Sequence, residues 1–120
     1  MQSRIAEMRD LSQRAKTLHS IGVQGLSDHA AEQQAIDMYR ELKDDLALRM
    51  KAFNRLRFGG TTPWYELAYD AGIRHAHQAM IARSGSSPKN PKWHTAAQAL
   101  ESELDYYLDK LEKGVAGSTA

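Results

Sequence analysis

The segment between Gly59 and Ser86 contains the side chains best suited to acid–base or metal chemistry, among them His75, His77, Glu66 and Asp70. Successive residues of a helix are rotated by about 100°, so the two histidines point about 200° apart and cannot bind one metal ion together. Carboxylate metal centres in helical bundles use a Glu-x-x-His pair on each of two helices, and the sequence contains no such pair. We therefore predict no metal ion and no other cofactor.

One side of the helix expected in this segment is apolar. It carries Trp64, Leu67, Ala68, Ala71, His75, Ala79 and Ala82. Because these residues lie in one arc, we predict that they face the core and that His75 is a core or boundary residue with one hydrogen bond. Four polar residues lie on the far side: Glu66, Asp70, Arg74 and His77. Asp70 and Arg74 are four residues apart and are expected to form an ion pair.

A second apolar side of the same helix is formed by Tyr65, Tyr69, Ala76 and Met80. One apolar side is enough to join a bundle, and tyrosine and methionine are common at protein interfaces. The second side therefore indicates either contact with another chain or a helix buried between two neighbours. The interface is the basis of our leading functional interpretation.

The segment RMKAFNRLRF, residues 49–58, carries four cations and no acid: Arg49, Lys51, Arg55 and Arg57. Arg40 lies earlier on the helix predicted here. Cations near a helix C-terminus stabilise the helix dipole, which explains the cluster without a ligand. The alternative interpretation is that these five residues bind the phosphate backbone of RNA or DNA.

Arg14 and His19 in RAKTLH have an Arg-x4-His spacing that resembles the motif of HEPN-type ribonucleases. Members of that family are small helical domains that pair an arginine and a histidine near a dimer axis, so the resemblance implies RNA cleavage by these two residues. The position after the arginine, usually polar in the family, is Ala15 on an apolar stripe, and the remainder of the family pattern is not evident. A HEPN-like ribonuclease is the third interpretation.

The composition limits the remaining classes of function. The 120 residues are 42% hydrophobic and 26% charged, which is typical of one soluble domain. The sequence has no cysteine, which excludes disulfides, thiolate nucleophiles and cysteine-based metal sites. The first twenty residues interleave charges with apolar residues, so we expect neither a signal peptide nor a membrane span and predict a cytoplasmic protein. A formal net charge of +1 gives no global attraction to nucleic acid.

Four helices with apolar residues at spacings of three and four are predicted, separated by turns that contain glycine. They cover about residues 3–20, about 28–58, 63–83 and 91–113, and residues 114–120 are expected to be a frayed tail. The second should be the longest, at roughly 45 Å for about thirty residues. Thr62 and Pro63 are predicted to cap and begin the third helix. The predicted fold is an all-α single domain over residues 1–120, an antiparallel four-helix bundle with a long second helix.

The leading functional interpretation is a non-catalytic helical protein that acts as an assembly or interaction subunit through Tyr65, Tyr69, Ala76 and Met80. Its partner is another protein or a second copy of the chain. The alternative is a nucleic-acid-binding subunit that uses the basic end of the second helix. No cofactor and no membrane are expected in any of the three interpretations.

Overall fold

The chain folds into an elongated bundle in the computed structural model, which describes residues 2–24, 29–55, 62–82 and 91–118. Across these residues it forms four α-helices: α1 (Gln2–Gln24), α2 (His29–Arg55), α3 (Trp64–Ala82) and α4 (Pro91–Ser118). The bundle measures 49 × 30 × 20 Å along its principal axes. The predicted all-α fold is confirmed.

The ends of the helices follow from local chemistry. The Pro63 carbonyl accepts hydrogen bonds from the backbone N–H groups of Glu66 and Leu67, at 3.1 and 3.2 Å, so α3 begins at Trp64, one residue later than predicted. The second proline-initiated helix, α4, begins at Pro91 as predicted. It continues to Ser118, beyond Gly114, where the sequence predicted a frayed tail. Within the described residues α4 has 28 residues and α2 has 27, so the predicted second helix is long, and its predicted end near residue 58 lies outside the described residues.

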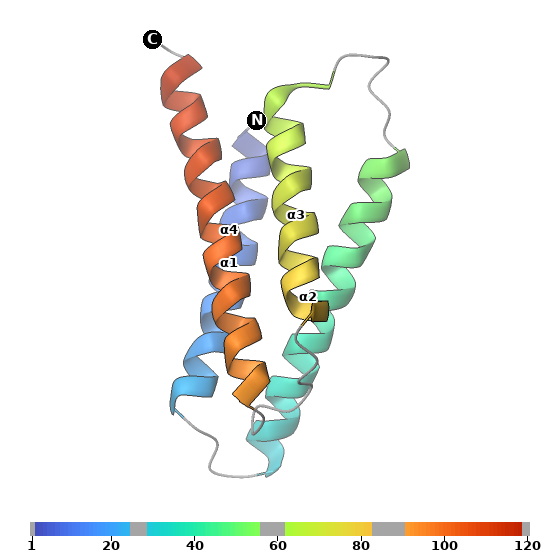
Figure 1. Ribbon diagram of the computed structural model, residues 1–120, viewed down its shortest axis with the longest axis vertical. Coiled ribbons are helices and arrows are strands. Elements are labelled where there is room, and N and C mark those ends of the chain that lie inside the picture. Colours follow the sequence, from blue (N-terminus) through green and yellow to red (C-terminus); the bar gives the residue numbers. More distant parts are fainter. Residues whose placement is uncertain (1, 25–28, 56–61, 83–90, 119–120) are drawn as a thin grey trace.

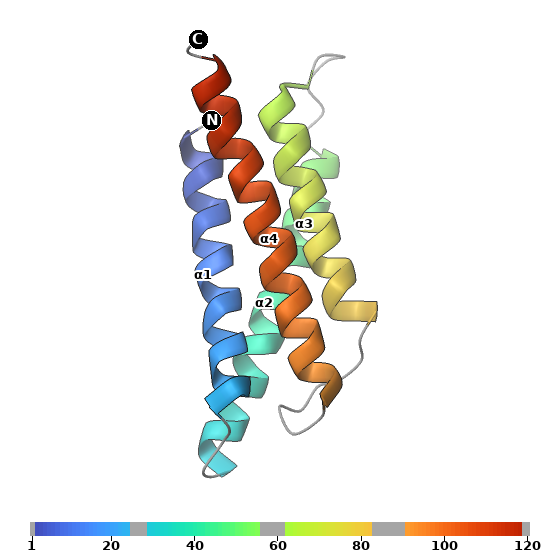
Figure 2. The same ribbon diagram turned by 60° about the vertical axis from the view of Figure 1, so that its left-hand side comes forward.

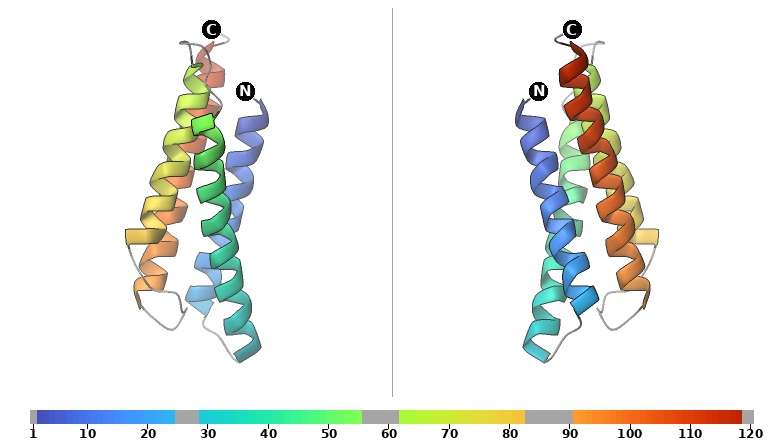
Figure 3. Two further views of the ribbon diagram at one scale, coloured as in Figure 1. Left: turned by 90° about the vertical axis from the view of Figure 1, so that its right-hand side faces the viewer. Right: turned by 90° about the vertical axis from the view of Figure 1, so that its left-hand side faces the viewer.

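Helices that are neighbours in the bundle run antiparallel (Figure 1). His19 near the end of α1 bonds Glu101 in the first half of α4, and Tyr39 of α2 bonds the carbonyl of Met80 at the end of α3. In Figure 2, α4 lies in front, between α1 and α3. Figure 3 shows α2 on the opposite side of the bundle from α4. The helix α4 packs closely on both α1 and α3, whereas α2 packs less extensively on α3 and least on α1.

The core runs along the bundle axis and uses the stripes predicted for three of the helices. From α1 it contains Ile5, Met8, Leu11, Ala15 and Leu18, from α2 Ala35, Tyr39, Leu42 and Leu46, and from α4 Trp93, Ala97, Leu100, Leu104 and Leu111. The rings of Tyr39 and Trp93 lie 5.9 Å apart, which joins the diagonal pair α2 and α4. Each of these helices has one apolar stripe, and that stripe faces inward.

The orientation of α3 is the reverse of the prediction. Tyr69 and Met80 are 2% exposed and Ala76 is fully buried, while Tyr65 is half-buried against the core. This side is therefore part of the interior of the single chain, where α3 packs against both α2 and α4, so of the two predicted alternatives the helix buried between two neighbours is the one observed. The other apolar side faces outward, with Trp64 43% and Leu67 54% exposed.

Close packing of small residues explains why this side of α3 is buried. Gly72 lies on the same side as Ile73, and a Cβ atom at Gly72 would come within 2.7 Å of Met8 Cε and 2.9 Å of Tyr107 Cβ. Without a side chain at Gly72, α3 can approach α1 and α4 closely enough to bury Ile73.

None of the helices has, within the described residues, an apolar stretch of the length that a bilayer crossing requires.

Candidate functional site

The titratable residues of α3 point toward different neighbours. His75, predicted as a core or boundary residue, is exposed instead, and its Nδ1 lies 3.8 Å from a carboxylate oxygen of Glu103. His77 lies on another side of α3, where burial, assisted by Lys43 of α2, lowers its pKa. The predicted pair of Asp70 and Arg74 is present at 2.8 Å. In the part of the chain that the structure describes, no three metal-ligating side chains come together.

The arginine and histidine of the HEPN-like spacing do not converge. Arg14 Nη1 lies 2.6 Å from Asp45 of α2, whereas His19 Nδ1 lies 2.7 Å from Glu101 of α4. Two catalytic groups must reach the same substrate atoms, but each of these side chains is turned toward a carboxylate on a different helix. The geometry of the single chain therefore gives no support to a ribonuclease site.

The basic end of α2 also differs from the predicted patch. Arg49 points inward and bonds to Asp45, Glu7 and Tyr69 rather than facing solvent. Arg40 and Lys51 are exposed, but eleven residues of helix place them about 16 Å apart along the axis. The side chain of Arg55 and the whole of Arg57 lie outside the described residues.

Three exposed acids lie on this same helix, at Asp37, Glu41 and Asp44. They interleave with Arg40, so the described part of α2 presents mixed charges along its outer side. A surface of mixed charge attracts a phosphate backbone less than a continuous basic edge does.

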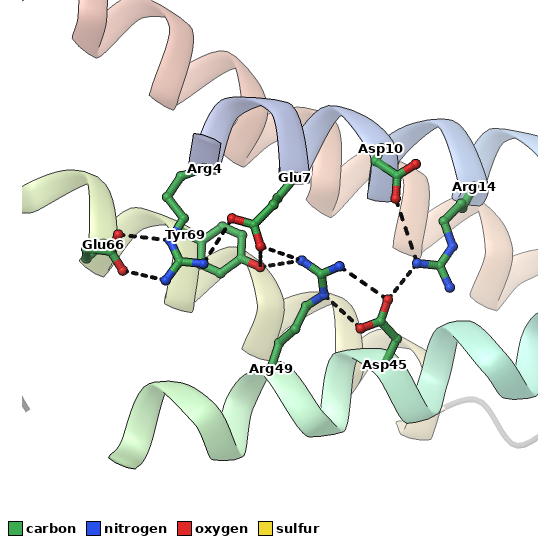
Figure 4. Close-up of polar contacts among 8 residues, drawn as sticks. All are labelled: Arg4, Glu7, Asp10, Arg14, Asp45, Arg49, Glu66 and Tyr69. Atoms are coloured by element: carbon green, nitrogen blue, oxygen red, sulfur yellow. Dashed lines mark hydrogen bonds and ion pairs between the residues drawn. The ribbon is translucent and has the colours of Figure 1, made fainter. Parts of the chain in front are cut away.

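Charged side chains instead form a partly buried cluster between α1, α2 and α3 (Figure 4). At one end Arg4 binds both oxygens of Glu66, each at 2.9 Å, and also bonds Glu7 at 3.0 Å. Glu66 is only 7% exposed, so it lies against α1 and not on the solvent side predicted for it. The bidentate bond raises the pKa of Arg4. The Arg4 guanidinium also lies over the Tyr69 ring, 4.2 Å from its centroid.

Arg49 joins the other end of the cluster. It donates to Asp45 at 2.8 Å, to Glu7 at 3.0 Å and to the Tyr69 hydroxyl at 2.6 Å. Burial would raise the pKa of Asp45, but the hydrogen bonds from Arg49 and Arg14 outweigh it and hold that pKa below its ordinary value. Burial raises the pKa of Tyr69 despite the adjacent Arg49. The charged side chains of this cluster pair with one another across the three helices, so the cluster links α1, α2 and α3.

The outward side of α3 forms a groove with α4. The groove has a volume of about 560 Å³ and is lined by Trp64, Leu67, Ala68, Ala71, Tyr107, Lys110 and Lys113. We call this surface the α3/α4 face. Tyr106, 55% exposed, adjoins it because its ring packs edge-on against Tyr107 at 5.0 Å. The α3/α4 face is apolar and aromatic at its centre and carries lysines at its α4 side.

The position of Trp64 depends on a glycine of α4. A Cβ atom at Gly114 would lie 2.0 Å from Cη2 of the Trp64 indole, so the ring occupies the space that any side chain there would need. The indole also meets Tyr65 edge-on at 6.0 Å. One part of the Trp64 indole thus packs over Gly114, and the rest of its surface is exposed to solvent.

No protein-family model, no curated protein sequence and no solved structure matches this chain. Trp64 and Leu67 were predicted to face the core, and this prediction was wrong because both sides of α3 are apolar. A signal for the correct orientation was present in Ile73, which completes the series Tyr65, Tyr69, Ile73, Ala76 and Met80 at spacings of three and four.

Proposed function

We propose that this protein is a non-catalytic interaction subunit that binds another protein through the α3/α4 face. The observation that carries the proposal is the exposure of Trp64 and Leu67 beside a groove of about 560 Å³. Large apolar side chains that adjoin one another on a surface mark interaction sites, whereas single scattered ones do not. Tryptophan and tyrosine also contribute strongly to binding energy at interfaces.

The packing of the bundle supports the same function. The core is filled by the inward sides of all four helices, so Trp64 and Leu67 are not needed to complete it. Trp64 is nevertheless held in a fixed position over Gly114. A side chain that is already ordered loses less conformational entropy when a partner covers it. The face combines exposed apolar area with preorganisation.

The experiment compares two leucine variants in a selection for binding peptides. A display library of helical peptides is panned against the wild-type protein, and the enriched peptides are then measured against Leu67→Glu and Leu48→Glu. Leu48 is 65% exposed on α2, so the second variant carries the same substitution on a surface remote from the groove. Circular dichroism checks that both variants remain folded.

We expect binding to be lost in Leu67→Glu and retained in Leu48→Glu. The glutamate places a charge on the apolar centre of the face, and burying an unpaired charge is strongly unfavourable. Failure to enrich any peptide, or enrichment of peptides that bind Leu67→Glu as well as wild type, would show that the α3/α4 face is not the binding surface.

A further inference from the structure

Lys110 differs from the other lysine of the groove in its surroundings. Lys113 Nζ lies 3.0 Å from Asp109 one turn earlier, so its charge is compensated within α4. Lys110 Nζ lies 5.3 Å from the centroid of the Tyr106 ring and 5.8 Å from that of Tyr107. Among the described residues, no carboxylate forms an ion pair with Lys110. An ammonium group held over aromatic rings is thus left without an anion at the edge of an apolar groove.

The shape of the α3/α4 face suits an extended partner. A small ligand is usually enclosed on most of its surface, but Trp64 and Leu67 remain about half exposed and the groove is open along the bundle. The distance from Trp64 to Ala71 is seven residues of α3, which is about 10 Å or two helical turns. An α-helix laid along the groove would present apolar residues at i, i+3 or i+4, and i+7 over this length.

We infer that the partner segment is an amphipathic helix whose apolar side is bordered by carboxylates. This inference rests on the proposed function of the α3/α4 face. The apolar residues of the helix cover Trp64, Leu67 and Ala71, and an aspartate or glutamate at the border pairs with Lys110. The ammonium lies over the two tyrosine rings at 5.3 and 5.8 Å, so a carboxylate of the partner can pair with it without displacing an internal partner.

A second copy of this chain is a poorer occupant. The outer side of α2 does carry acids, at Asp37, Glu41 and Asp44, in the turns that precede the exposed Leu48. Leu48 is, however, the one large apolar residue exposed on the described part of α2. A single leucine covers less of the groove than three apolar residues of an amphipathic helix, and little burial remains to offset the entropy cost of association.

The test uses three synthetic helical peptides that share a leucine stripe and differ only at its border, which is glutamate, glutamine or lysine. Binding is followed by protein tryptophan fluorescence. The chain has two tryptophans, and because Trp93 is fully buried, a shift in the emission spectrum on binding reports on Trp64. The protein variants are Lys110→Gln and Leu67→Glu. The matched control is Lys51→Gln, at an exposed lysine of α2.

The glutamate peptide should bind up to about fivefold more tightly than the glutamine peptide, and up to about 25-fold more tightly than the lysine peptide. The differences should shrink as salt is added. The Lys110→Gln variant should bind the glutamate peptide only as tightly as wild type binds the glutamine peptide. The Lys51→Gln variant should bind the glutamate peptide with unchanged affinity. Leu67→Glu should abolish binding of all three.

Equal affinity for the glutamate and lysine peptides would overturn the acidic border while leaving the proposed function in place. Absence of binding by all three peptides, together with an unsuccessful display selection, would overturn both. Sedimentation that shows a wild-type oligomer, dissociated by Leu48→Glu as well as by Leu67→Glu, would identify a second copy as the occupant and overturn the inference.

Discussion

The orientation of α3 is tested by replacing one residue on each of its apolar sides with alanine. Met80 is 2% exposed, and its removal leaves a cavity between α3 and the neighbouring helices. Replacement of a buried methionine by alanine costs about 2–5 kcal/mol. Leu67 is 54% exposed, so less than half of the 1.5–3 kcal/mol associated with complete burial of a leucine is available to be lost. We expect the free energy of unfolding to fall by about 1 kcal/mol in Leu67→Ala and by about 3 kcal/mol in Met80→Ala.

Urea unfolding followed by circular dichroism separates the two values. With a slope of about 2 kcal/mol per molar urea, Met80→Ala should lower the midpoint by about 1.5 M and Leu67→Ala by about 0.5 M. The slope itself should be unchanged in both variants, because neither substitution alters the area exposed on unfolding substantially. A midpoint that falls further for Leu67→Ala than for Met80→Ala would mean that α3 is rotated and that Trp64 and Leu67 belong to the core.

Three further outcomes follow from the packing and the charged cluster. The pKa of Asp45 is lowered in the folded state, against the effect of burial, by hydrogen bonds from arginines. Its carboxylate therefore stabilises the fold above its ordinary pKa and this contribution is lost as pH falls through the lowered value, so Asp45→Asn should flatten the decline in stability as pH falls below the ordinary value of 3.8, measured by urea unfolding. Gly72→Ala should destabilise by up to about 2 kcal/mol in thermal melts, because the new Cβ atom would lie 2.9 Å from Tyr107 Cβ and overpacking outweighs the gain of about 1 kcal/mol in helix propensity. Tyr69→Phe should lower the free energy of unfolding by about 1–2 kcal/mol, because Arg49 loses an acceptor at 2.6 Å. An unchanged free energy of unfolding would show that this hydrogen bond contributes nothing to stability.

The sequence predicted the four helices and most of the core because α1, α2 and α4 each have a single apolar stripe. Spacing alone identifies the inward side in such helices, as it did for Leu42 and Leu46 in α2. In α3 both sides are apolar, and the choice between them depends on tertiary contacts of Gly72 with α1 and α4. Periodicity describes one helix at a time and contains no information about those contacts.

The groove was missed for the same reason, because it exists only if Trp64 faces outward, and the sequence signal for that orientation was the longer apolar series that Ile73 completes. The charged cluster had no local signal either. Arg4 and Glu66 are 62 positions apart, so no i, i+4 rule relates them. Asp70 and Arg74 were predicted correctly since their pairing lies within one helix. Interactions within a helix were thus accessible from sequence, and those between helices were not.

The charged cluster has a consequence for how α2 can slide along α1. In the observed alignment Arg49 meets Glu7, and Asp45 meets Arg14. A shift of α2 by one turn, about 5.4 Å, toward the N-terminus of α1 would bring Asp45 to the acids Glu7 and Asp10 and Arg49 to Arg4. The helices α1 and α2 pack on each other less closely than α1 packs on α4, and leucine and alanine tolerate such a slip far better than opposed like charges do. We therefore expect the cluster to select a single register of α2 and to exclude its neighbour, which is a contribution to uniqueness more than to stability.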